Sequence, residues 1–429
     1  MSIFTADIKY EPYWWGASPR LEWASAEWPE RVDVAIVGGG YAGLNAAIPL
    51  AEAGLRVAVI EAERFGEGAS TRNGGAIGAT LRYSFAALIE RAGLERAIHL
   101  YSGAIASRKF LIDLLETRGI DCQFVRCGRF SGAHKQADYD GLARDLELRQ
   151  HHLDVDARMV PRSEQRAYIG TDQYFGGRVH NEDGNLNPGL YHDGLMAAAA
   201  KAGVMLLDRA RVTQVRQAGG AFKVATSRGD MRADRVIVAT NAYTGPEFGW
   251  FRRRLVPIQS QIIATEPLPP DLVRSLIPRG HQVVDTCKLH NYYRLSPDGT
   301  RVLFGGRSGA SQVNNFAKSG QSLFRRMTGL FPQLAGAKVT HSWGGFIAFS
   351  FDHLPHMTEA DGIHYIGSCC GSGVAMMSYL GHSTALKLLG QTYDATFETP
   401  FKRQLFYSGD PWFMPAIIGV LELRDRYRI

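Results

Sequence analysis

Cysteine is scarce in this sequence, and the spacing of the few cysteines excludes two kinds of site. The five cysteines are an odd number and include no Cys-x-x-Cys pair. We therefore expect neither a disulfide framework nor a zinc site, and reduced thiols in a cytoplasmic protein fit this usage best. The motif His353-x-x-His356 has no matching carboxylate, so no metal is expected there. The adjacent Cys369 and Cys370 are expected to be small buried residues.

Long apolar runs and a strong charge bias are also missing. Charged residues interrupt the first thirty positions, and no apolar stretch reaches the length of a membrane span. The net charge is +6, and the basic residues are scattered apart from the run at 252–254. This weak basic patterning argues against a nucleic-acid partner. We expect a soluble, unexported protein without a transmembrane segment.

What is present begins with a glycine-rich turn between two predicted strands. An apolar run at 32–37 is typical of a central parallel strand, and a helix at 42–53 and a second strand at 55–61 are predicted to follow. The spacing Gly-x-Gly-x-x-Gly allows a tight turn and a close approach of backbone to a pyrophosphate. The second strand ends in an acid that can accept hydrogen bonds from ribose hydroxyls. The sequence therefore predicts a dinucleotide site that includes Gly38, Gly40, Gly43 and Glu61.

The loop at 64–78 favours FAD over NAD as the dinucleotide. It is dense in glycine and in small hydroxyl and amide residues, and such a loop can place backbone donors along an extended diphosphate. A second Gly-x-Gly-x-x-Gly turn with its own βαβ unit is not found, which argues against an NAD(P)H-dependent disulfide reductase.

The turn at 38–43, the pair Glu61-Ala62 and the loop at 68–75 resemble the FAD-binding signature of the D-amino-acid oxidase-like (DAO) superfamily. That group includes glycine oxidase, sarcosine oxidase and D-amino acid dehydrogenase. The γ-glutamylputrescine oxidoreductase-like branch is the most similar, because it shares a Tyr-Trp-Trp opening, a Ser-x-Arg-Asn-Gly-Gly loop and a Leu-Pro-His segment. The resemblance covers roughly residues 10–425. It implies noncovalent FAD, since the cysteine or histidine that tethers the flavin in some relatives is missing here.

The resemblance also implies particular contacts with FAD. In relatives, a strand ending like 238–242 lies close to the cofactor, and a valine placed like Val212 meets the adenine. The turn at 367–374 resembles the C-terminal glycine turn of the family, and a helix that opens there would direct its amides at the flavin ring. The expected cofactor-binding residues are Gly38, Gly40, Tyr41, Ala42, Gly43, Glu61, Ala62, Ser70, Thr71, Arg72, Asn73, Gly74, Gly75, Val212, Thr240, Asn241, Gly371, Ser372, Gly373 and Val374.

Substrate contacts are expected from a second lobe. Tyr292 and Arg294 point to the same face of a predicted strand, and Arg307 ends its hairpin partner. An aromatic ring beside a guanidinium suits a substrate with an apolar stem and a carboxylate. His353 is a candidate for a polar wall near the flavin, and so are His290 and His356. The alternatives are a structural ion pair for the arginines and a hydrogen-bonded structural role for the histidines.

The expected fold class is α/β, with a Rossmann-like FAD-binding lobe interleaved with an α+β substrate lobe on a mainly antiparallel sheet. An aromatic arm at 1–30, with its tryptophans within 10–28, is expected to pack as an irregular strap across the body; the alternatives are a lid over the substrate and a contact with a partner. The expected segments of the FAD-binding lobe are 31–125, 188–250 and 346–395; those of the substrate lobe are 126–187 and 251–345; a C-terminal tail follows at 396–429.

Together these features predict oxidation of a C–N bond in an amine or amino acid, by hydride transfer to flavin N5 followed by imine hydrolysis. The amine and its chirality stay open, and so does the electron acceptor. Oxidases of the family often place a lysine near the flavin, and the strand at 302–306 holds none, so a quinone or carrier is an alternative to oxygen. The rivals are a flavin monooxygenase, whose Gly-Asp motif is missing, and an RNA-binding flavoprotein, which the scattered basic residues disfavour.

Overall fold

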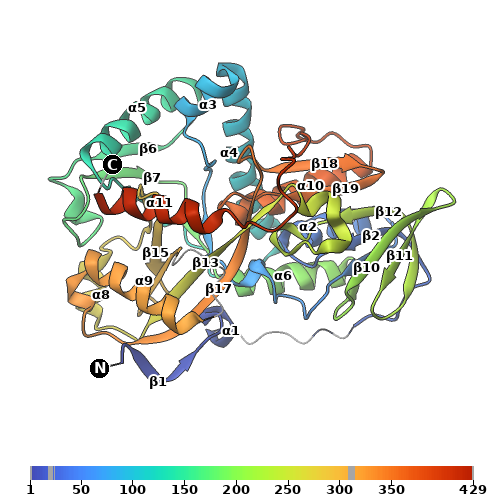
Figure 1. The fold of residues 1–429 in the computed structure, drawn as a ribbon, viewed down its shortest axis with the longest axis horizontal. Coiled ribbons are helices and arrows are strands. Elements are labelled where there is room, and N and C mark those ends of the chain that lie inside the picture. The colour runs from blue at the N-terminus through green and yellow to red at the C-terminus, as the bar shows by residue number, and fades with distance from the viewer. Residues whose placement is uncertain (1, 18–22, 24, 308–314, 428–429) are drawn as a thin grey trace.

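The computed structural model describes residues 2–17, 23, 25–307 and 315–427, and this part of the chain is built around two large β-sheets (Figure 1). Each sheet collects segments that lie far apart in the sequence, because the chain passes between the two sheets several times. The interleaved α/β architecture expected from the sequence is therefore confirmed.

The first sheet has a central parallel strand buried on both faces. This strand, β2, pairs in parallel with β12 on one side and β3 on the other. Val34 and Ile36 pack into one hydrophobic core and Ala35 and Val37 into another, which is why the run is apolar throughout. In order, the described strands are β10 (Val212–Ala218), β11 (Ala221–Thr226), β12 (Asp230–Val238), β2 (Arg31–Val37), β3 (Val57–Ile60) and β9 (Met205–Leu207), with β19 (Ile363–Gly367) beside β12 and β18 (His356–Ala360) beside β19.

A layer of helices covers one face of this sheet. These helices are α2 (Tyr41–Glu52), α4 (Leu94–Arg118), α6 (Pro188–Lys201) and α10 (Gly373–Leu388). The expected helical stretch at 85–118 is divided into α3 (Phe85–Ala92) and α4, because Gly93 takes φ 82°. The start of α6 is fixed by Asn187, whose side chain accepts hydrogen bonds from the Gly189 and Leu190 amides.

The second sheet is mainly antiparallel and forms the other lobe. In order, the described strands are β1 (Phe4–Lys9), β17 (Val339–Phe349), β13 (Val256–Thr265), β16 (Val302–Gly306), β15 (Asn291–Leu295), β14 (Gln282–Asp285), β5 (Arg129–Gly132), β7 (Gly177–His180) and β6 (Ala157–Val160). The predicted hairpin is present as β15 and β16, paired in register from Leu295 and Val302 onward. A small separate ladder joins β4 (Ala76–Ile77) to β8 (Gly184–Asn185).

The remaining described helices lie around the second sheet and at the chain ends. They are α1 (Tyr13–Ala17), α5 (Gln136–His152), α7 (Gly249–Arg252), α8 (Pro270–Leu276), α9 (Phe316–Leu330) and α11 (Met414–Tyr427). The expectation of an irregular arm at 1–30 is wrong in part, since β1 joins the second sheet beside β17 and α1 is helical. The packing expected of its aromatic residues is seen at Trp14, which is fully buried, while positions 18–22 and 24 of the arm lie outside the described residues. In the described ranges, no helix combines the length and apolarity needed to cross a bilayer.

Helices α2 and α10 cross at very close range. A Cβ on Gly381 of α10 would lie 2.2 Å from the Ala42 carbonyl oxygen of α2. Only glycine fits at such a crossing, because the backbones themselves are in contact.

We expect Gly381→Ala to lower the melting temperature and weaken FAD retention, since it forces α10 away from α2 at a cost of about 1–3 kcal/mol. The matched control is Gly329→Ala, because Gly329 is an exposed glycine in α9 and a Cβ added to it would have no neighbouring atom within 4 Å. That change should be neutral or slightly stabilising. Thermal melts of both variants decide the point, and equal melting temperatures would contradict the close-packing argument.

Candidate active site

A cavity of about 1880 Å³ lies between the two sheets and is lined by residues of both. A drug-sized ligand needs roughly 300–1,000 Å³. The cavity therefore has room for a dinucleotide and a substrate together. It begins at the turn between β2 and α2 and extends along the second sheet.

The first wall of the cavity is the glycine turn. Gly38 takes φ 109°, and a Cβ on it would lie 3.0 Å from the Ala239 carbonyl oxygen. A Cβ on Gly43 would lie 2.0 Å from the Gly38 carbonyl oxygen, so α2 can approach the turn only because both residues are glycine. The N-terminus of α2 faces the cavity through Gly40, Tyr41 and Ala42. A helix N-terminus with a glycine turn is a site for phosphate oxygens.

Glu61 stands at the end of β3 on the same wall. Its carboxylate accepts hydrogen bonds from the Gly39 amide at 2.9 Å and from the Glu63 amide at 3.2 Å. Burial raises the pKa of Glu61, and these two amides act in the opposite direction by stabilising the charged form. Ala62 and Val212 line the cavity beside it. The acid therefore faces the region where the adenosine half of a dinucleotide would lie.

The loop at 64–78 is fastened to the turn and to the aromatic arm. Ser70 Oγ accepts a hydrogen bond from the Tyr41 amide at 3.1 Å. Asn73 Nδ2 donates to the Ser70 carbonyl at 3.0 Å, and its Oδ1 accepts from the Gly75 amide at 2.8 Å. Trp15 Nε1 donates to Thr71 Oγ1 at 2.9 Å, so the arm packs directly on the loop.

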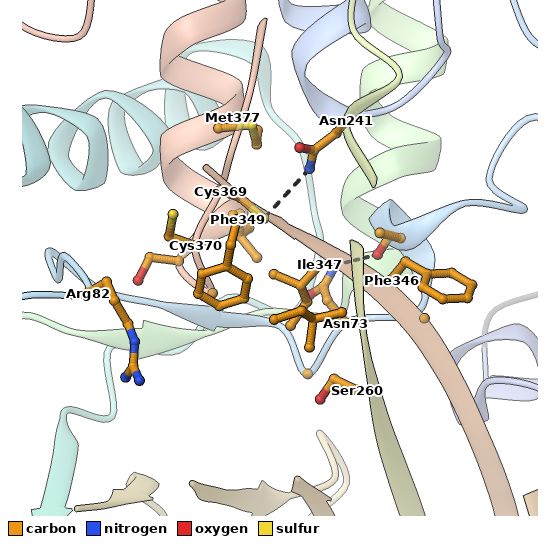
Figure 2. A pocket seen from close by; sticks show the side chains of 18 of the residues that line it. Asn73, Arg82, Asn241, Ser260, Phe346, Ile347, Phe349, Cys369, Cys370 and Met377 are labelled. Atoms are coloured by element: carbon orange, nitrogen blue, oxygen red, sulfur yellow. Dashed lines mark hydrogen bonds between the residues drawn. The ribbon is translucent and has the colours of Figure 1, made fainter. Parts of the chain in front are cut away.

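At the opposite end of the cofactor region, the N-terminus of α10 opens onto the cavity. Gly371, Ser372, Gly373 and Val374 line it, as do Thr240 and Asn241. Figure 2 shows the Asn241 amide directed toward Cys369, at an Nδ2 to Sγ distance of 3.6 Å. Ser372 Oγ is 2.9 Å from Thr80 Oγ1, which joins this turn to the loop after β4.

The two adjacent thiols are free and buried. Burial raises the pKa of Cys370 to about 12, so this sulfur stays protonated near neutral pH and is a poor nucleophile. Noncovalent attachment of the cofactor stays a prediction that this property supports.

These residues fit FAD. One continuous cavity has an acid for the ribose, a glycine turn at a helix N-terminus for the pyrophosphate, and a second helix N-terminus for the flavin ring. Three expected contacts do not line it. Gly43 packs on the turn, Thr71 is buried under Trp15, and Gly75 packs against the Leu186 carbonyl.

The predicted substrate residues are separated by the structure. Tyr292, Arg307 and His353 line the cavity. The Tyr292 hydroxyl is 2.9 Å from Ser260 Oγ, and burial raises its pKa to about 12. Burial lowers the pKa of Arg307 to about 10, and burial followed by the nearby Arg82 charge lowers that of His353. All three therefore keep one protonation state near neutral pH.

Arg294, which we expected to contact substrate, does not line the cavity and is a structural residue instead. Its Nη1 donates to the Leu186 carbonyl at 2.8 Å and to the Gly74 carbonyl at 3.2 Å. Its guanidinium also lies over the Trp14 ring at 5.5 Å. The side chain is aimed between the lobes by strand alternation, and the buried carbonyls there take its donors.

His290, one of the candidates for the polar wall, lines the cavity, but its partners could not be assigned from the sequence. His290 Nε2 is 2.8 Å from Arg82 Nη1, and since arginine only donates, the histidine accepts there and donates through Nδ1 to the Asp285 carbonyl at 2.9 Å. Figure 2 shows Arg82 apart from the cofactor residues, at one side of the pocket. No local sequence pattern indicates this pairing. The other unassigned lining residues include Arg129, Arg149, Arg178, Trp412, Phe413 and Met414.

The fold and the cavity together define an FAD-binding oxidoreductase with interleaved nucleotide and substrate lobes. The sequence matches the family model described as FAD dependent oxidoreductase, DAO, over residues 33–386. The chain therefore belongs to the DAO family of FAD-dependent oxidoreductases and is an enzyme that uses FAD.

Individual relatives match over most of their length. A probable oxidoreductase OrdL from Rhizobium meliloti (strain 1021) is 32% identical, over 96% of this chain and 98% of the relative. The gamma-glutamylputrescine oxidoreductase of Escherichia coli (strain K12) is 31% identical, over 86% of both. The structure of glycine oxidase from Geobacillus kaustophilus superposes with a TM-score of 0.75 at 22% identity, covering 88% of this chain and all of that one.

We expect Glu61→Gln to weaken FAD binding about 10- to 100-fold, because hydrogen bonds to a charged group contribute about 1.5–3 kcal/mol and each 1.4 kcal/mol is tenfold. Fluorescence titration of the apoprotein with FAD measures the change. Glu52→Gln is the matched control, since Glu52 is exposed, pairs with Arg118 at 2.8 Å and does not line the cavity. Equal affinities for the two variants would remove Glu61 from the site.

Proposed function

We propose that this protein oxidises a C–N bond in an amine or amino acid. The observation that carries the proposal is the continuity of the cavity from Glu61 and the α10 N-terminus to Tyr292 in the other lobe and to His353 in the connection between β17 and β18. The names of the E. coli and Geobacillus relatives, which refer to a putrescine derivative and to glycine, support an amine as the reactive group. A γ-glutamylputrescine-like amine, a secondary amine and an amino acid are the substrate classes that we propose to test.

Bound FAD supplies the oxidant, by accepting a hydride from the carbon next to nitrogen. The side chains near the proposed reaction site have the task of holding the amine neutral and oriented. Tyr292 stays protonated and His353 stays neutral because burial disfavours the charged form of each. A neutral, partly desolvated wall favours the unprotonated amine, whose lone pair assists loss of the hydride. The imine product is hydrolysed by water to a carbonyl compound and an amine or ammonia.

The electron acceptor is proposed to be oxygen or an external carrier. The titration described below distinguishes the two when air is readmitted. The C-terminal segment supports an external carrier as the acceptor. Trp412 and Phe413 line the cavity beside α11, and Trp412, which is 69% exposed, offers such a carrier an apolar surface at the cavity. The free thiols of the described cysteines agree with our proposal of a cytoplasmic location.

The test is an anaerobic titration of the purified holoprotein with putrescine, γ-glutamylputrescine, sarcosine, glycine and D-alanine. We expect one member to bleach the flavin absorbance band, and readmission of air then distinguishes an oxidase, which recovers the band quickly, from a dehydrogenase. Bleaching by none of a broad amine panel, with FAD visibly bound, would overturn the proposal and favour the monooxygenase alternative.

We expect Tyr292→Phe to lower kcat/KM for the best amine about tenfold, the effect of one hydrogen bond of about 1.4 kcal/mol, without changing FAD affinity. Because the pKa of Tyr292 is raised to about 12, the hydroxyl is protonated on both sides of neutrality, and the ratio of wild type to variant should be constant from pH 6 to 10.

The matched control is Tyr293→Phe. Tyr293 lies on the opposite face of β15, buried in the lobe core with its hydroxyl 3.1 Å from that of Tyr174. The Tyr293→Phe variant should have a lower melting temperature and unchanged values of kcat and KM. A kinetic loss as large for Tyr293→Phe as for Tyr292→Phe would show that the effect is structural.

A further inference from the structure

Three buried arginines line the cavity where β5, β7 and α5 border it. Arg129 lies on β5, Arg178 on β7 and Arg149 on α5, at the end of the second sheet away from β17 (Figure 1). Their exposed fractions are 8%, 7% and 2%. A buried charge without a partner is strongly unfavourable, so the acceptors available to each guanidinium determine what this region can bind.

Two aspartates supply most of the acceptors, and both are already engaged. Asp183 accepts a hydrogen bond from Arg108 Nη1 at 3.0 Å and forms an ion pair with Arg129 Nη2 at 3.0 Å. Asp145 accepts from Arg178 Nη1 at 2.9 Å and from the backbone amide of Phe85 at 2.7 Å. These bonds tie the strands to α4 and α5 and account for a structural role of Arg108, Arg129 and Arg178.

The guanidinium of Arg149 makes no hydrogen bond to either aspartate. Its closest carboxylate contact is Asp145 Oδ2, 3.9 Å from Nη1, which is too long for a hydrogen bond. Among the described residues, no acceptor bonds its guanidinium, and its Nε is buried without a partner. The guanidinium is held 4.6 Å over the Tyr101 ring, which fixes it in place at the cavity wall. The contact with Asp145 is thus an ion pair without a hydrogen bond. A planar cation that is oriented at a cavity wall and has free donors is a binding group for a carboxylate.

We propose that Arg149, assisted by the positive charges of Arg129 and Arg178, binds a carboxylate at the end of the substrate remote from the oxidised C–N bond. This inference rests on the proposed function and narrows its substrate class. It selects amines that carry an anionic group at a distance over simple amines and over amino acids whose carboxylate adjoins the reactive carbon.

The spacing of strands in the second sheet sets the distance between the oxidised carbon of the substrate and its carboxylate. Tyr292 on β15, Val284 on β14, Ser131 on β5 and Arg178 on β7 line the cavity on successive strands. Neighbouring strands lie about 4.8 Å apart, so β5 is roughly 10 Å and β7 roughly 14 Å from β15. An extended chain covers about 3.5 Å for every three bonds, so about nine to twelve bonds separate the oxidised carbon from the carboxylate. γ-Glutamylputrescine, with about nine such bonds, is within this range.

The kinetic test compares γ-glutamylputrescine with its analogue that lacks only the carboxylate, 4-amino-N-(4-aminobutyl)butanamide. In Arg149→Met, we expect kcat/KM for the carboxylate substrate to fall about 10- to 100-fold through KM, the loss of a charge-assisted bidentate contact, with little change for the analogue. Arg149→Lys should recover part of the loss. Equal losses for both substrates, or no loss for either, would overturn the proposal.

A binding test is independent of turnover. Glutarate, which has no amine to oxidise, is titrated calorimetrically into the holoenzyme and should bind at least tenfold more weakly to Arg149→Met. Arg108→Gln is the control from the same cluster, because Arg108 is paired and does not line the cavity, and it should retain glutarate affinity. If no amine reduces the flavin while glutarate binding depends on Arg149, the proposed function fails and the carboxylate site stands.

Stability separates a binding residue from a structural one. Because Arg149 is a buried charge without a hydrogen-bonded partner among the described residues, Arg149→Met should keep or raise the melting temperature. Arg108→Gln should lower it, because it removes the hydrogen-bonded ion pair with Asp183. A clear loss of stability and of FAD in Arg149→Met, together with equal losses of kcat/KM for the carboxylate substrate and its analogue, would assign the residue to the fold and overturn the proposal.

Discussion

Three successive carbonyl groups in the cofactor loop, those of Arg72, Asn73 and Gly74, connect the two lobes of this enzyme. They accept hydrogen bonds from Trp343 at 3.0 Å, Trp14 at 2.9 Å and Arg294 at 3.2 Å, respectively. None of these donors belongs to the nucleotide sheet. These carbonyls are partly buried and take their hydrogen bonds from the second lobe and the arm, so both help to hold the loop in its cofactor-binding shape. The shape of the cavity therefore depends on contacts between the two lobes.

The same arrangement gives the cavity two chemically different ends. Near the cofactor residues, burial keeps Tyr292 and His353 uncharged, which suits a neutral amine. Toward β5 and β7, the wall carries buried arginines, and Arg149 has no hydrogen-bonded partner within the described chain. A substrate with an amine at one end and a carboxylate at the other would be oriented by this difference alone. Orientation by binding groups distant from the reacting bond is a general source of enzyme specificity.

Local sequence patterns predicted the parts of the fold that depend on neighbouring residues. The strand–turn–helix unit, the helix at α6 and the β15–β16 hairpin follow from apolar periodicity, a helix cap and turn residues that lie within a few positions of each other. Irregular structure was wrongly expected for the whole arm because the pairing of β1 with β17 joins residues more than three hundred positions apart. No local signal specifies such a contact.

The sequence by itself determined the cofactor, because the glycine spacing and Glu61 act through backbone geometry within a single βαβ unit. The tertiary structure decided which side chains meet the substrate. Arg294 and Arg149 are both arginines in regular elements, yet the first pairs with the Leu186 carbonyl while the second faces the cavity without a hydrogen bond. That difference depends on acceptors supplied by distant segments, and a buried charge takes its role from the partners that the fold places around it.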